Sequence, residues 1–355
     1  MTDRKTPRIR FKGFTDDWEQ RKLSQLTTEF KSGEGIKADE IEENGTYPVY
    51  GGNGLRGYTE RYNHDGEYAL IGRQGALCGN MNYSVGKAYF TEHAVAVKAN
   101  ESNDTRFLYY LLDRMDLGRY SDQSAQPGLA VNKLVVLHTY VPRKQEQEAI
   151  GVYFKSLDHL ITLHQSKAES WKNKKNQLST IYWEQRKVQD IYKITRGYVL
   201  AAPETDENSS DDMPYPVYSS QTKNNGLMGY YKDYLYEDAI TWTTDGANAG
   251  TVNYRAGKFY CTNVCGVLLS DEGYANKCAA EALNNVAWKW VSHVGNPKLM
   301  NNVMGEIPIS LPRSIEEQDQ ISKFFEEIDN LITLHQSELE KLQKIKKSML
   351  ERMFV

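Results

Sequence analysis

The stretch Leu-Ile-Thr-Leu-His-Gln-Ser occupies residues 160–166 and returns unchanged at residues 331–337, 171 positions later. The other repeated motifs are Trp-Glu-Gln-Arg-Lys at residues 18–22 and 183–187 and Tyr-Pro-Val-Tyr at residues 47–50 and 215–218. Repeats of roughly 20–50 residues build solenoids, whereas a unit of ~165 residues is a domain with a connector. The sequence therefore predicts two versions of one unit, which act at two places on one partner.

A heptad pattern runs through both copies around the repeated stretch. In the first copy its positions are Ile150, Phe154, Leu157, Ile161, His164, Ala168, Trp171, Lys175, Leu178 and Tyr182. In the second copy they are Ile321, Phe325, Ile328, Ile332, His335, Leu339, Leu342, Lys346, Met349 and Met353. Alternating spacings of four and three residues predict a coiled coil. We expect two long antiparallel helices, over residues 143–182 and 313–355, that act as a spacer of fixed length.

Polar residues interrupt both heptad stripes at the same places, at His164 and His335 and at Lys175 and Lys346. One interpretation is that they fix the register of the helix pair at some cost in stability. The other is that the lysines extend their charged ends to water and the histidines are satisfied edge residues. Both interpretations stay open.

The residues outside the helices predict two globular α+β domains, at residues 1–142 and 183–312. Glycine-bounded apolar runs predict short strands at residues 69–72, 94–98, 239–243 and 265–269, and helices at 107–115 and 277–291. The 355 residues carry a formal net charge of −4, so any nucleic-acid binding must come from a local field.

Several classes of protein are disfavoured by what the sequence lacks. No run of ~18 apolar residues predicts a membrane span, and no secretory signal is recognisable, so we expect a cytoplasmic protein. The four cysteines do not recur with the repeat, and Cys261-x-x-x-Cys265 is only a weak candidate for half of a metal site, so we expect no metal.

A glycine-rich frame is the best-matched segment of the two globular domains. Residues 75–91 read Gly-Ala-x-x-Gly-x-x-Asn-Tyr-x-x-Gly-Lys-x-Tyr-x-Thr, and the same pattern fills residues 246–262. The frame is either a ligand-contacting surface or a β-hairpin with core tyrosines. Just before it the copies diverge, with Arg73-Gln74 in one and Thr244-Asp245 in the other. Arginine reads guanine, glutamine reads adenine and aspartate accepts from cytosine.

These patterns give a set of candidate DNA-contacting residues. In the first copy they are Arg56, Arg61, Arg73, Gln74, Asn80, Asn82, Tyr83, Lys87, Gln123 and Gln126. In the second copy they are Thr243, Thr244, Asp245, Asn248, Asn253, Tyr254, Arg255, Lys258, Lys298 and Asn301. No catalytic motif accompanies them, so we predict no catalytic residues in this chain. The alternative is an enzyme in its own right, such as a nuclease with an unrecognised site.

The repeated motifs together resemble the specificity (S) subunits of type I restriction-modification enzymes. The resemblance rests on Arg10–Lys22, the Tyr-Pro-Val-Tyr boxes, the glycine-rich frames and the two helix segments Asp158–Gln165 and Asp329–Gln336. It implies two target-recognition domains, each reading one half of a split, asymmetric DNA site. It also implies helices that bind methyltransferase (M) subunits, which restriction (R) subunits join.

The resemblance places the chemistry on the partners. S-adenosylmethionine, ATP and magnesium are implied for the M and R subunits, and no cofactor for this chain. Two near-identical surfaces predict two M subunits per chain. The candidate partner-binding residues are Trp18, Arg21, Gln165, Trp183, Arg186 and Gln336.

Overall fold

The computed structural model describes residues 6–121, 128–176, 183–220 and 223–355. The chain divides into two compact units. Unit 1 comprises Met1–Ser166 and Gln336–Val355, and unit 2 comprises Lys167–His335. Within the described residues, no helix has both the length and the apolar character needed to cross a membrane.

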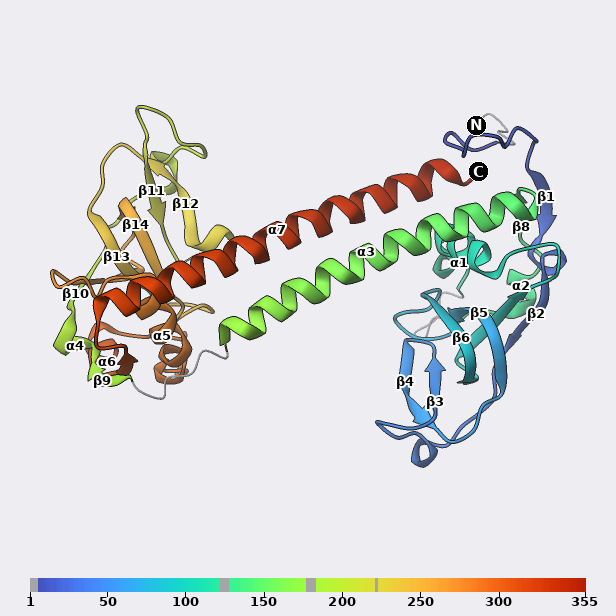
Figure 1. Cartoon of the computed structure of the whole chain (residues 1–355), viewed down its shortest axis with the longest axis horizontal. Coiled ribbons are helices and arrows are strands. Elements are labelled where there is room, and N and C mark those ends of the chain that lie inside the picture. Colours follow the sequence, from blue (N-terminus) through green and yellow to red (C-terminus); the bar gives the residue numbers. More distant parts are fainter. Residues whose placement is uncertain (1–5, 122–127, 177–182, 221–222) are drawn as a thin grey trace. The chain divides into compact units, whose positions relative to one another are not determined.

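Unit 1 begins with a short strand and carries a sheet, small helices and parts of both long helices (Figure 1). Its strands are β1 (Glu19–Lys22), β2 (Thr27–Ser32), β3 (Tyr47–Gly51), β4 (Gly54–Thr59), β5 (His64–Gly72), β6 (Met81–Phe90), β7 (Ala94–Ala99) and β8 (His138–Val141). Its helices are η1 (Leu23–Gln25), η2 (Ala38–Glu40), α1 (Thr105–Arg114), η3 (Leu117–Tyr120), α2 (Val131–Leu134) and the first part of α3 (Lys144–Asn176).

Unit 2 repeats this order with small changes in the helices. Its strands are β9 (Glu184–Lys187), β10 (Lys193–Arg196), β11 (Tyr215–Tyr218), β12 (Leu227–Tyr231), β13 (Tyr236–Thr243), β14 (Val252–Cys261), β15 (Cys265–Leu269) and β16 (Pro308–Leu311). Its helices are α4 (Val188–Ile191), η4 (Ala202–Glu204), η5 (Lys223–Gly226), α5 (Lys277–Ala287), η6 (Trp288–Trp290), α6 (Asn301–Glu306) and the first part of α7 (Ile315–Met353).

The two units have the same sheet topology. The six-stranded sheet of unit 1 has the order β2-β7-β5-β6-β3-β4, and that of unit 2 has the order β10-β15-β13-β14-β11-β12. Each unit adds a two-stranded antiparallel ribbon, β1 with β8 and β9 with β16. One strand of each ribbon is the Glu-Gln-Arg-Lys part of the repeated motif. The internal repeat predicted from the sequence is confirmed, as is the α+β class.

A buried glutamine joins each long helix to its own globular unit. The Gln147 side chain, 1% exposed, donates to the carbonyl of Pro142 (2.8 Å) and accepts from the backbone N–H of Asp104 (3.0 Å). Asp104 in turn caps α1 by accepting from Phe107 N–H at 2.7 Å. The amide therefore ties the end of β8, the start of α1 and the first turn of α3 together.

Unit 2 repeats this junction with Gln318, which is fully buried. Its amide donates to the carbonyl of Pro312 at 2.8 Å, and its oxygen accepts from Asn276 Nδ2 at 2.8 Å. Asn276 caps α5 by accepting from Ala279 N–H at 3.0 Å. Each long helix therefore leaves its unit in a direction set by buried hydrogen bonds, whose loss would leave polar groups unsatisfied.

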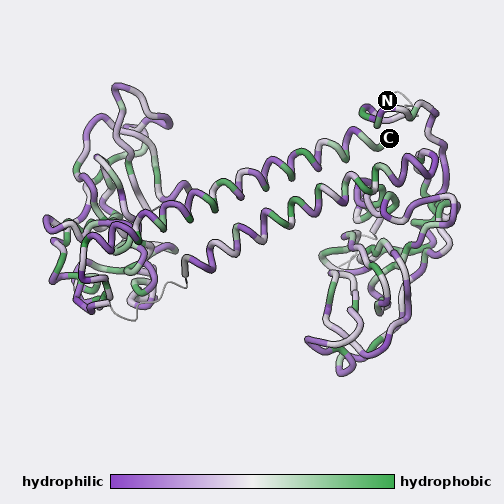
Figure 2. Tube along the Cα trace, in the orientation of Figure 1, coloured by the Kyte–Doolittle hydropathy of each residue, from purple (hydrophilic) through white to green (hydrophobic). Residues whose placement is uncertain are grey.

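The last residues of α7 pack on α3 within unit 1, and the two helices run antiparallel there. Phe354 lies against Phe154 with ring centroids 5.9 Å apart, and eight residues earlier Lys346 pairs with Asp158 at 2.6 Å. Apolar residues recur along both helices in Figure 2. The predicted stripe is buried or partly buried at every described side chain. Leu178 and Tyr182, and the side chain of Lys175, lie outside the described residues.

The polar interruptions of the stripe have partners in the folded chain. Lys346 Nζ pairs with Asp158 and lies 5.5 Å from the ring centroid of Tyr110. The charge on Lys341, chiefly through its hydrogen bond, holds the pKa of Glu338 below its usual range, and His164 contributes in the same direction. Because a specific ion pair holds Lys346, its position favours the register interpretation over a lysine that only extends to water.

The predicted elements agree with the structure to within a few residues, but the domain division differs. The predicted strands lie within β5, β7, β13 and β15, and the predicted helix over residues 277–291 ends at Ala287 before η6. The sequence predicts the long helices as separate segments at residues 143–182 and 313–355, whereas the two compact units divide each helix between them. An isolated helix stripe must bury its apolar face against something.

Phe354 completes the core of unit 1 and makes the contribution of these last residues measurable. It is 4% exposed and contacts Trp18 (6.3 Å) and Phe107 (5.4 Å between ring centroids). Replacing Phe354 with Ala is expected to lower the free energy of unfolding of unit 1 by about 3–5 kcal/mol, because it leaves a cavity. Hydrogen exchange should show α1 losing protection while β13–β15 of unit 2 keep theirs. Val355→Ala, at a 42% exposed neighbour, is the control and should change neither unit; equal loss of protection in both units would contradict the assignment.

Candidate nucleic-acid interface

In unit 1, three backbone hydrogen bonds bring separate loops to one surface. Arg73 N–H donates to the carbonyl of His93 and Thr91 N–H to the carbonyl of Tyr50, both at 2.9 Å. Leu129 N–H then donates to the carbonyl of Arg73 at 2.9 Å. We call this the loop surface of unit 1, formed by residues 50–56, 72–80, 91–93 and 128–129. Loops held on a rigid sheet are the usual carriers of binding residues.

Unit 2 uses the same three hydrogen bonds at the corresponding positions. Thr244 N–H donates to the carbonyl of Val264 (3.0 Å), Thr262 N–H to that of Tyr218 (2.9 Å) and Leu299 N–H to that of Thr244 (2.9 Å). The loop surface of unit 2 is formed by the described residues among 218–226 together with 243–251, 262–264 and 298–301. The framework is shared, so differences in chemistry between the units come from side chains.

Several predicted DNA-contacting residues lie on the loop surface of unit 1. Gln74 and Asn80 are exposed, and Arg73 is partly exposed with its guanidinium 3.5 Å from the carbonyl of Glu92. Arg56 is exposed beside the β3–β4 turn, where a β-carbon on Gly51 would come within 2.6 Å of Arg56 Cδ. These four side chains present hydrogen-bond donors and two positive charges from one surface.

The loop surface of unit 2 carries different chemistry at the matching positions. Asp245 and Lys298 pair at 3.5 Å and remain 33% and 51% exposed. Asn248 and Asn301 are partly exposed on neighbouring segments. An acceptor beside a lysine replaces the Arg73-Gln74 pair of unit 1, so the two surfaces are suited to different base edges.

Three residues of unit 2 that were predicted to contact DNA are buried. Thr243, Thr244 and Arg255 are only 8%, 7% and 8% exposed. Thr244 Oγ1 donates to Asp245 Oδ2 (2.8 Å) and lies 3.0 Å from the carbonyl of Val264, so it orients Asp245 instead of meeting a ligand. Arg255 is enclosed between β13 and the β11–β12 hairpin.

The identical tyrosines of the glycine-rich frame face the globular core and the long helices, not the loop surface. Tyr83 OH donates to Glu67 at 2.7 Å, and its ring contacts Tyr109 of α1. Tyr254 OH donates to Asp238 at 3.2 Å, and burial, helped by Asp238, raises the pKa of Tyr254 to about 12. These contacts favour the hairpin interpretation of the frame for both tyrosines, and their contact with DNA stays a prediction.

The other identical residues of the frame also have neighbours within their own unit, although Lys87 and Lys258 are exposed. Lys87 Nζ and Lys258 Nζ each lie 4.5 Å from the ring centroid of a tyrosine, Tyr62 and Tyr234. Asn82 packs beneath the β3–β4 turn, where its Oδ1 would lie 2.9 Å from a β-carbon on Gly54. Asn253 is its partly buried counterpart on β14, opposite Thr241. Identity between copies therefore marks the framework.

The other candidate DNA-contacting residues of unit 1 lie away from its loop surface or outside the described residues. Arg61 pairs with Glu40 at 2.8 Å and lines a hollow with Glu42 and Glu60, an acidic setting that does not suit a phosphate contact. Gln123 and Gln126 lie outside the described residues. Sequence reasoning missed His93, whose exposed ring sits on the loop surface of unit 1. The sequence signal that could have identified His93 is the difference between the two copies, because the second copy has Val264 at the corresponding position.

The predicted partner-binding residues fall into two groups. Trp18 is only 2% exposed and packs against Phe107, so its prediction as a surface contact is wrong. Trp183 is partly buried, in a hollow of about 360 Å³ that Cys278 and Phe325 also line.

The other partner-binding candidates are nearer to solvent. Arg186 is partly exposed and donates to Tyr274 OH at 3.2 Å, while Arg21 is exposed and pairs with Glu19. Gln165 and Gln336 are exposed on the long helices.

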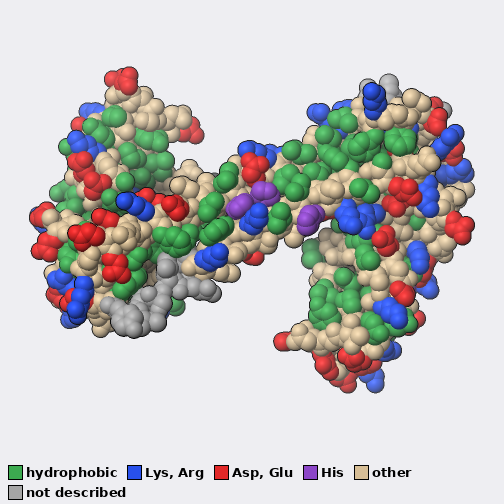
Figure 3. All heavy atoms as spheres, viewed as in Figure 1, with side chains coloured by type: hydrophobic (Ala, Val, Ile, Leu, Met, Phe, Trp, Pro, Cys, Tyr) green, Lys and Arg blue, Asp and Glu red, His purple; other side chains and the backbone are tan. Residues whose placement is uncertain are grey.

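Apolar side chains are also exposed on the long helices, as Figure 3 shows. Leu160 and Leu163 of α3 are 40% and 36% exposed, and Leu334 of α7, the counterpart of Leu163, is 55% exposed. Leu163 and Leu334 therefore share an exposed position in the two copies, as Gln165 and Gln336 do.

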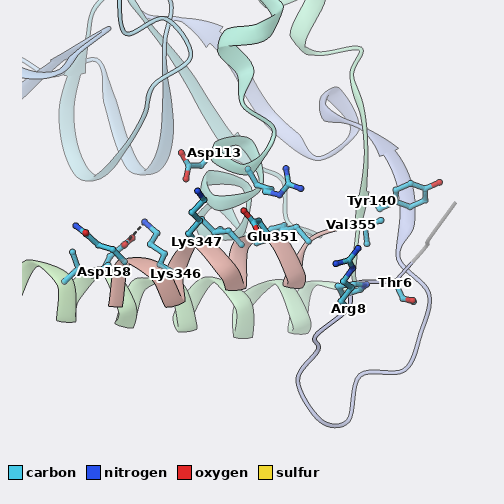
Figure 4. Close-up of a pocket in the computed structure, with 15 residues that line it drawn as sticks. Thr6, Arg8, Asp113, Tyr140, Asp158, Lys346, Lys347, Glu351 and Val355 are labelled. Carbon is cyan, nitrogen blue, oxygen red and sulfur yellow. Dashed lines mark ion pairs between the residues drawn. The ribbon is translucent and has the colours of Figure 1, made fainter. Parts of the chain in front are cut away.

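A cavity of about 1050 Å³ lies in unit 1 beside the α3–α7 contact (Figure 4). Its lining includes Asp113, Asp158, Lys346 and Lys347, and the Lys346–Asp158 pair spans part of it. Charges of both signs compensate one another there, so the cavity belongs to the helix junction. The cysteines are free thiols, and burial raises the pKa of Cys265 to about 11. No cluster of three metal-ligating side chains occurs among the described residues.

Comparison with known protein families decides what this architecture is. The model of the type I restriction modification DNA specificity domain matches twice, at residues 15–171 and 181–344. The chain belongs to this family. Its two matches coincide with the two copies of the repeat.

Individual relatives agree with the family assignment. The chain is 42% identical over 145 residues to the type I restriction enzyme EcoprrI specificity subunit of Escherichia coli, a match covering 40% of this chain and 36% of that protein. It is 43% identical over 137 residues to the N-terminus of a putative type I specificity subunit of Mycoplasma pneumoniae, covering 37% and 71%. The first of these matches thus spans only about a third of the relative's length.

A solved structure shows the same fold over nearly the whole chain. The crystal structure of a type I restriction-modification S subunit from M. genitalium superposes with a TM-score of 0.75 at 18% identity, covering 99% of each chain. The predicted fold, two globular α+β domains with long helices in an internal repeat, is therefore confirmed.

The structure separates the candidate DNA-contacting residues into those on the loop surfaces, such as Gln74, and those away from them, such as Tyr83. We therefore predict different effects for one substitution of each kind. Gln74→Ala should weaken binding of the chain to its preferred DNA site roughly 5- to 150-fold, because the expected base contact is lost. Tyr83→Phe should leave DNA affinity within about twofold and lower the free energy of unfolding by about 1 kcal/mol, because only the bond to Glu67 is lost. Fluorescence anisotropy and denaturant unfolding measure both. An equal loss of DNA affinity in the two variants would show that the sorting is wrong.

Proposed function

We propose that this chain is the DNA sequence-recognition subunit of a type I restriction-modification complex, reading a bipartite, asymmetric DNA site. The observation that carries the proposal is the pair of loop surfaces built on one framework with different side chains. Arg73 and Gln74 in unit 1 stand where unit 2 has Thr244 and Asp245, with Lys298 paired to Asp245. Two similar readers with different chemistry suit two different half-sites.

The chain acts in this proposal as a scaffold without chemistry of its own. Methylation and cleavage belong to M and R subunits, which would bring S-adenosylmethionine, ATP and magnesium. What supports this division is that the family model matched by both copies is described as a DNA specificity domain. A nuclease with an unrecognised site is the alternative, and activity of partner-free protein with magnesium would favour it.

The partner surface in this proposal lies on the long helices. The exposed residues Leu163 and Leu334, with Gln165 and Gln336, recur at positions that lie off the buried stripe. Helix packing alone would let these positions differ, so their identity supports a shared binding surface. Two equal surfaces suit two M subunits per chain, with R subunits joining through them. The use of the helices as a spacer of fixed length between half-sites stays a prediction.

Exchange of one unit tests the two-reader proposal. The chain is co-expressed with its methyltransferase subunit, and methylated adenines are mapped across a genome. The wild type should modify a split site with two different halves. Replacing residues 215–310 with those of a related chain should change one half only, because each loop surface is assembled within its own unit. If both halves changed together, the two units would not be independent readers.

Charge placed on the helix surface tests the partner proposal. Gln165→Arg combined with Gln336→Arg should weaken assembly at least tenfold while leaving helicity unchanged, because both positions are exposed. Native mass spectrometry should show two M subunits per wild-type chain and fewer on the variant. Lys323→Arg, at another exposed helix position, is the matched control. A stable one-to-one wild-type complex, or an unaffected double variant, would argue against the shared surface.

A further inference from the structure

The β11–β12 connection of unit 2 is longer than its counterpart in unit 1. Strand β3 ends at Gly51 and β4 begins at Gly54, so residues 52–53 make that turn. In unit 2 the connection runs over residues 219–226. Gly72 of unit 1 packs so closely on this turn that a β-carbon would come within 2.3 Å of the Gly52 carbonyl oxygen. Unit 2 has Thr243 at the matching position.

Two consecutive asparagines shape the described end of this longer loop. Asn224 and Asn225 have φ values of 51° and 52°, in the left-handed region. Residues other than glycine enter this region singly and at a cost, and asparagine tolerates it best. Both side chains are exposed. The loop adjoins the loop surface, because Ser219 N–H donates to the carbonyl of Gly226 (2.8 Å) and Thr262 Oγ1 to Ser219 Oγ (3.0 Å).

A buried arginine holds this loop from beneath. Arg255 donates from Nη2 to the carbonyl of Asn225 at 2.7 Å and from Nε to Thr241 Oγ1 at 3.1 Å. Its guanidinium carbon lies 3.7 Å from the ring centroid of Tyr218. Burial lowers the pKa of Arg255. A buried charge is unfavourable unless it is hydrogen-bonded. The bond from Arg255 to the carbonyl of Asn225 meets part of this need and also holds the loop backbone in place.

Unit 1 lacks this device. The position that corresponds to Arg255 is Ser84, a small residue on β6 that is 2% exposed. Its hydroxyl has no hydrogen-bond partner among the described residues. The arginine therefore goes with the longer loop, not with the shared framework.

We infer that Asn224 and Asn225 are base-reading residues of unit 2, and that Arg255 is the residue that positions them. This inference rests on the proposed DNA-reading function and deepens it by naming residues and the base they suit. An asparagine amide suits adenine, because its nitrogen can donate to N7 while its oxygen accepts from the N6 amino group. A fixed backbone sets the orientation of the two amides. Orientation is more important for hydrogen bonds to a base edge than for contact with a phosphate.

The test uses the full chain assembled with its methyltransferase subunit. Asn224→Gly combined with Asn225→Gly keeps the left-handed backbone and removes both amides. Genome-wide methylation mapping should show relaxed preference at one or two base pairs of one half-site, with the other half unchanged. Affinity for the preferred site should fall roughly 5- to 150-fold. Asn53→Gly, in the short turn of unit 1, is the matched control and should leave the half-site read by unit 2 unchanged.

Two further variants separate the roles. Asn224→Asp combined with Asn225→Asp keeps size and backbone but removes donors, so preference at the affected positions should move from adenine toward cytosine. Arg255→Met should relax the same positions as the glycine variant, because the loop loses its anchor. Unchanged preference in Arg255→Met, alongside relaxed preference in the glycine variant, would overturn the positioning role.

The remaining outcomes distinguish this inference from the proposed function. If the wild-type complex modified no split site, the proposed function itself would fail. If the wild type read a split site and the glycine and aspartate variants kept every base preference, only the inference would fail. Uniform weakening on all sequences, with unchanged preference, would assign the loop to the DNA backbone and overturn base reading as well.

Discussion

The direction in which each long helix leaves its unit depends on one buried amide. Gln147 and Gln318 each connect the carbonyl that ends a ribbon strand with the polar residues that cap the first helix behind the sheet. A buried glutamine can satisfy these groups only in one arrangement, since every unmade bond is costly in a dry environment. Strand ribbon, capped helix and long helix are therefore held as one rigid junction, in both copies.

The repeat separates framework from chemistry in a way that identity alone does not reveal. Residues identical in both copies, such as Tyr83 and Tyr254, hold the hairpins against the core and the helices. The residues that differ, such as Gln74 and Asp245, occupy the loop surfaces that the shared backbone hydrogen bonds assemble. In this chain, differing side chains therefore stand on a backbone framework that the two units share.

Periodicity and repetition were sufficient to predict the fold class, both long helices and the strands β5, β7, β13 and β15. The heptad stripe predicted which side chains of α3 and α7 turn inward, because burial along a helix follows its period. The site was predicted less well, because alternation along a strand does not say which sheet face meets solvent. Thus Tyr83 faces α1, and Arg255 lies beneath a loop that the sequence does not position. The junction role of Gln147 and Gln318 could have been predicted from the sequence. The two glutamines stand at matching positions of the copies, five residues after Pro142 and six residues after Pro312.

Phe354 ties the order of synthesis to the order of folding. Unit 1 contains most of the residues that leave the ribosome first, but its core also takes Met353 and Phe354. Roughly 190 residues separate Ser166 from Phe354, which translation at ~5–20 residues per second covers in roughly 10–40 s. During that interval Trp18, Phe107 and Phe154 await their last aromatic neighbour. Unit 1 therefore begins to be synthesised first, but its core receives its last residues after all residues of unit 2 have been synthesised.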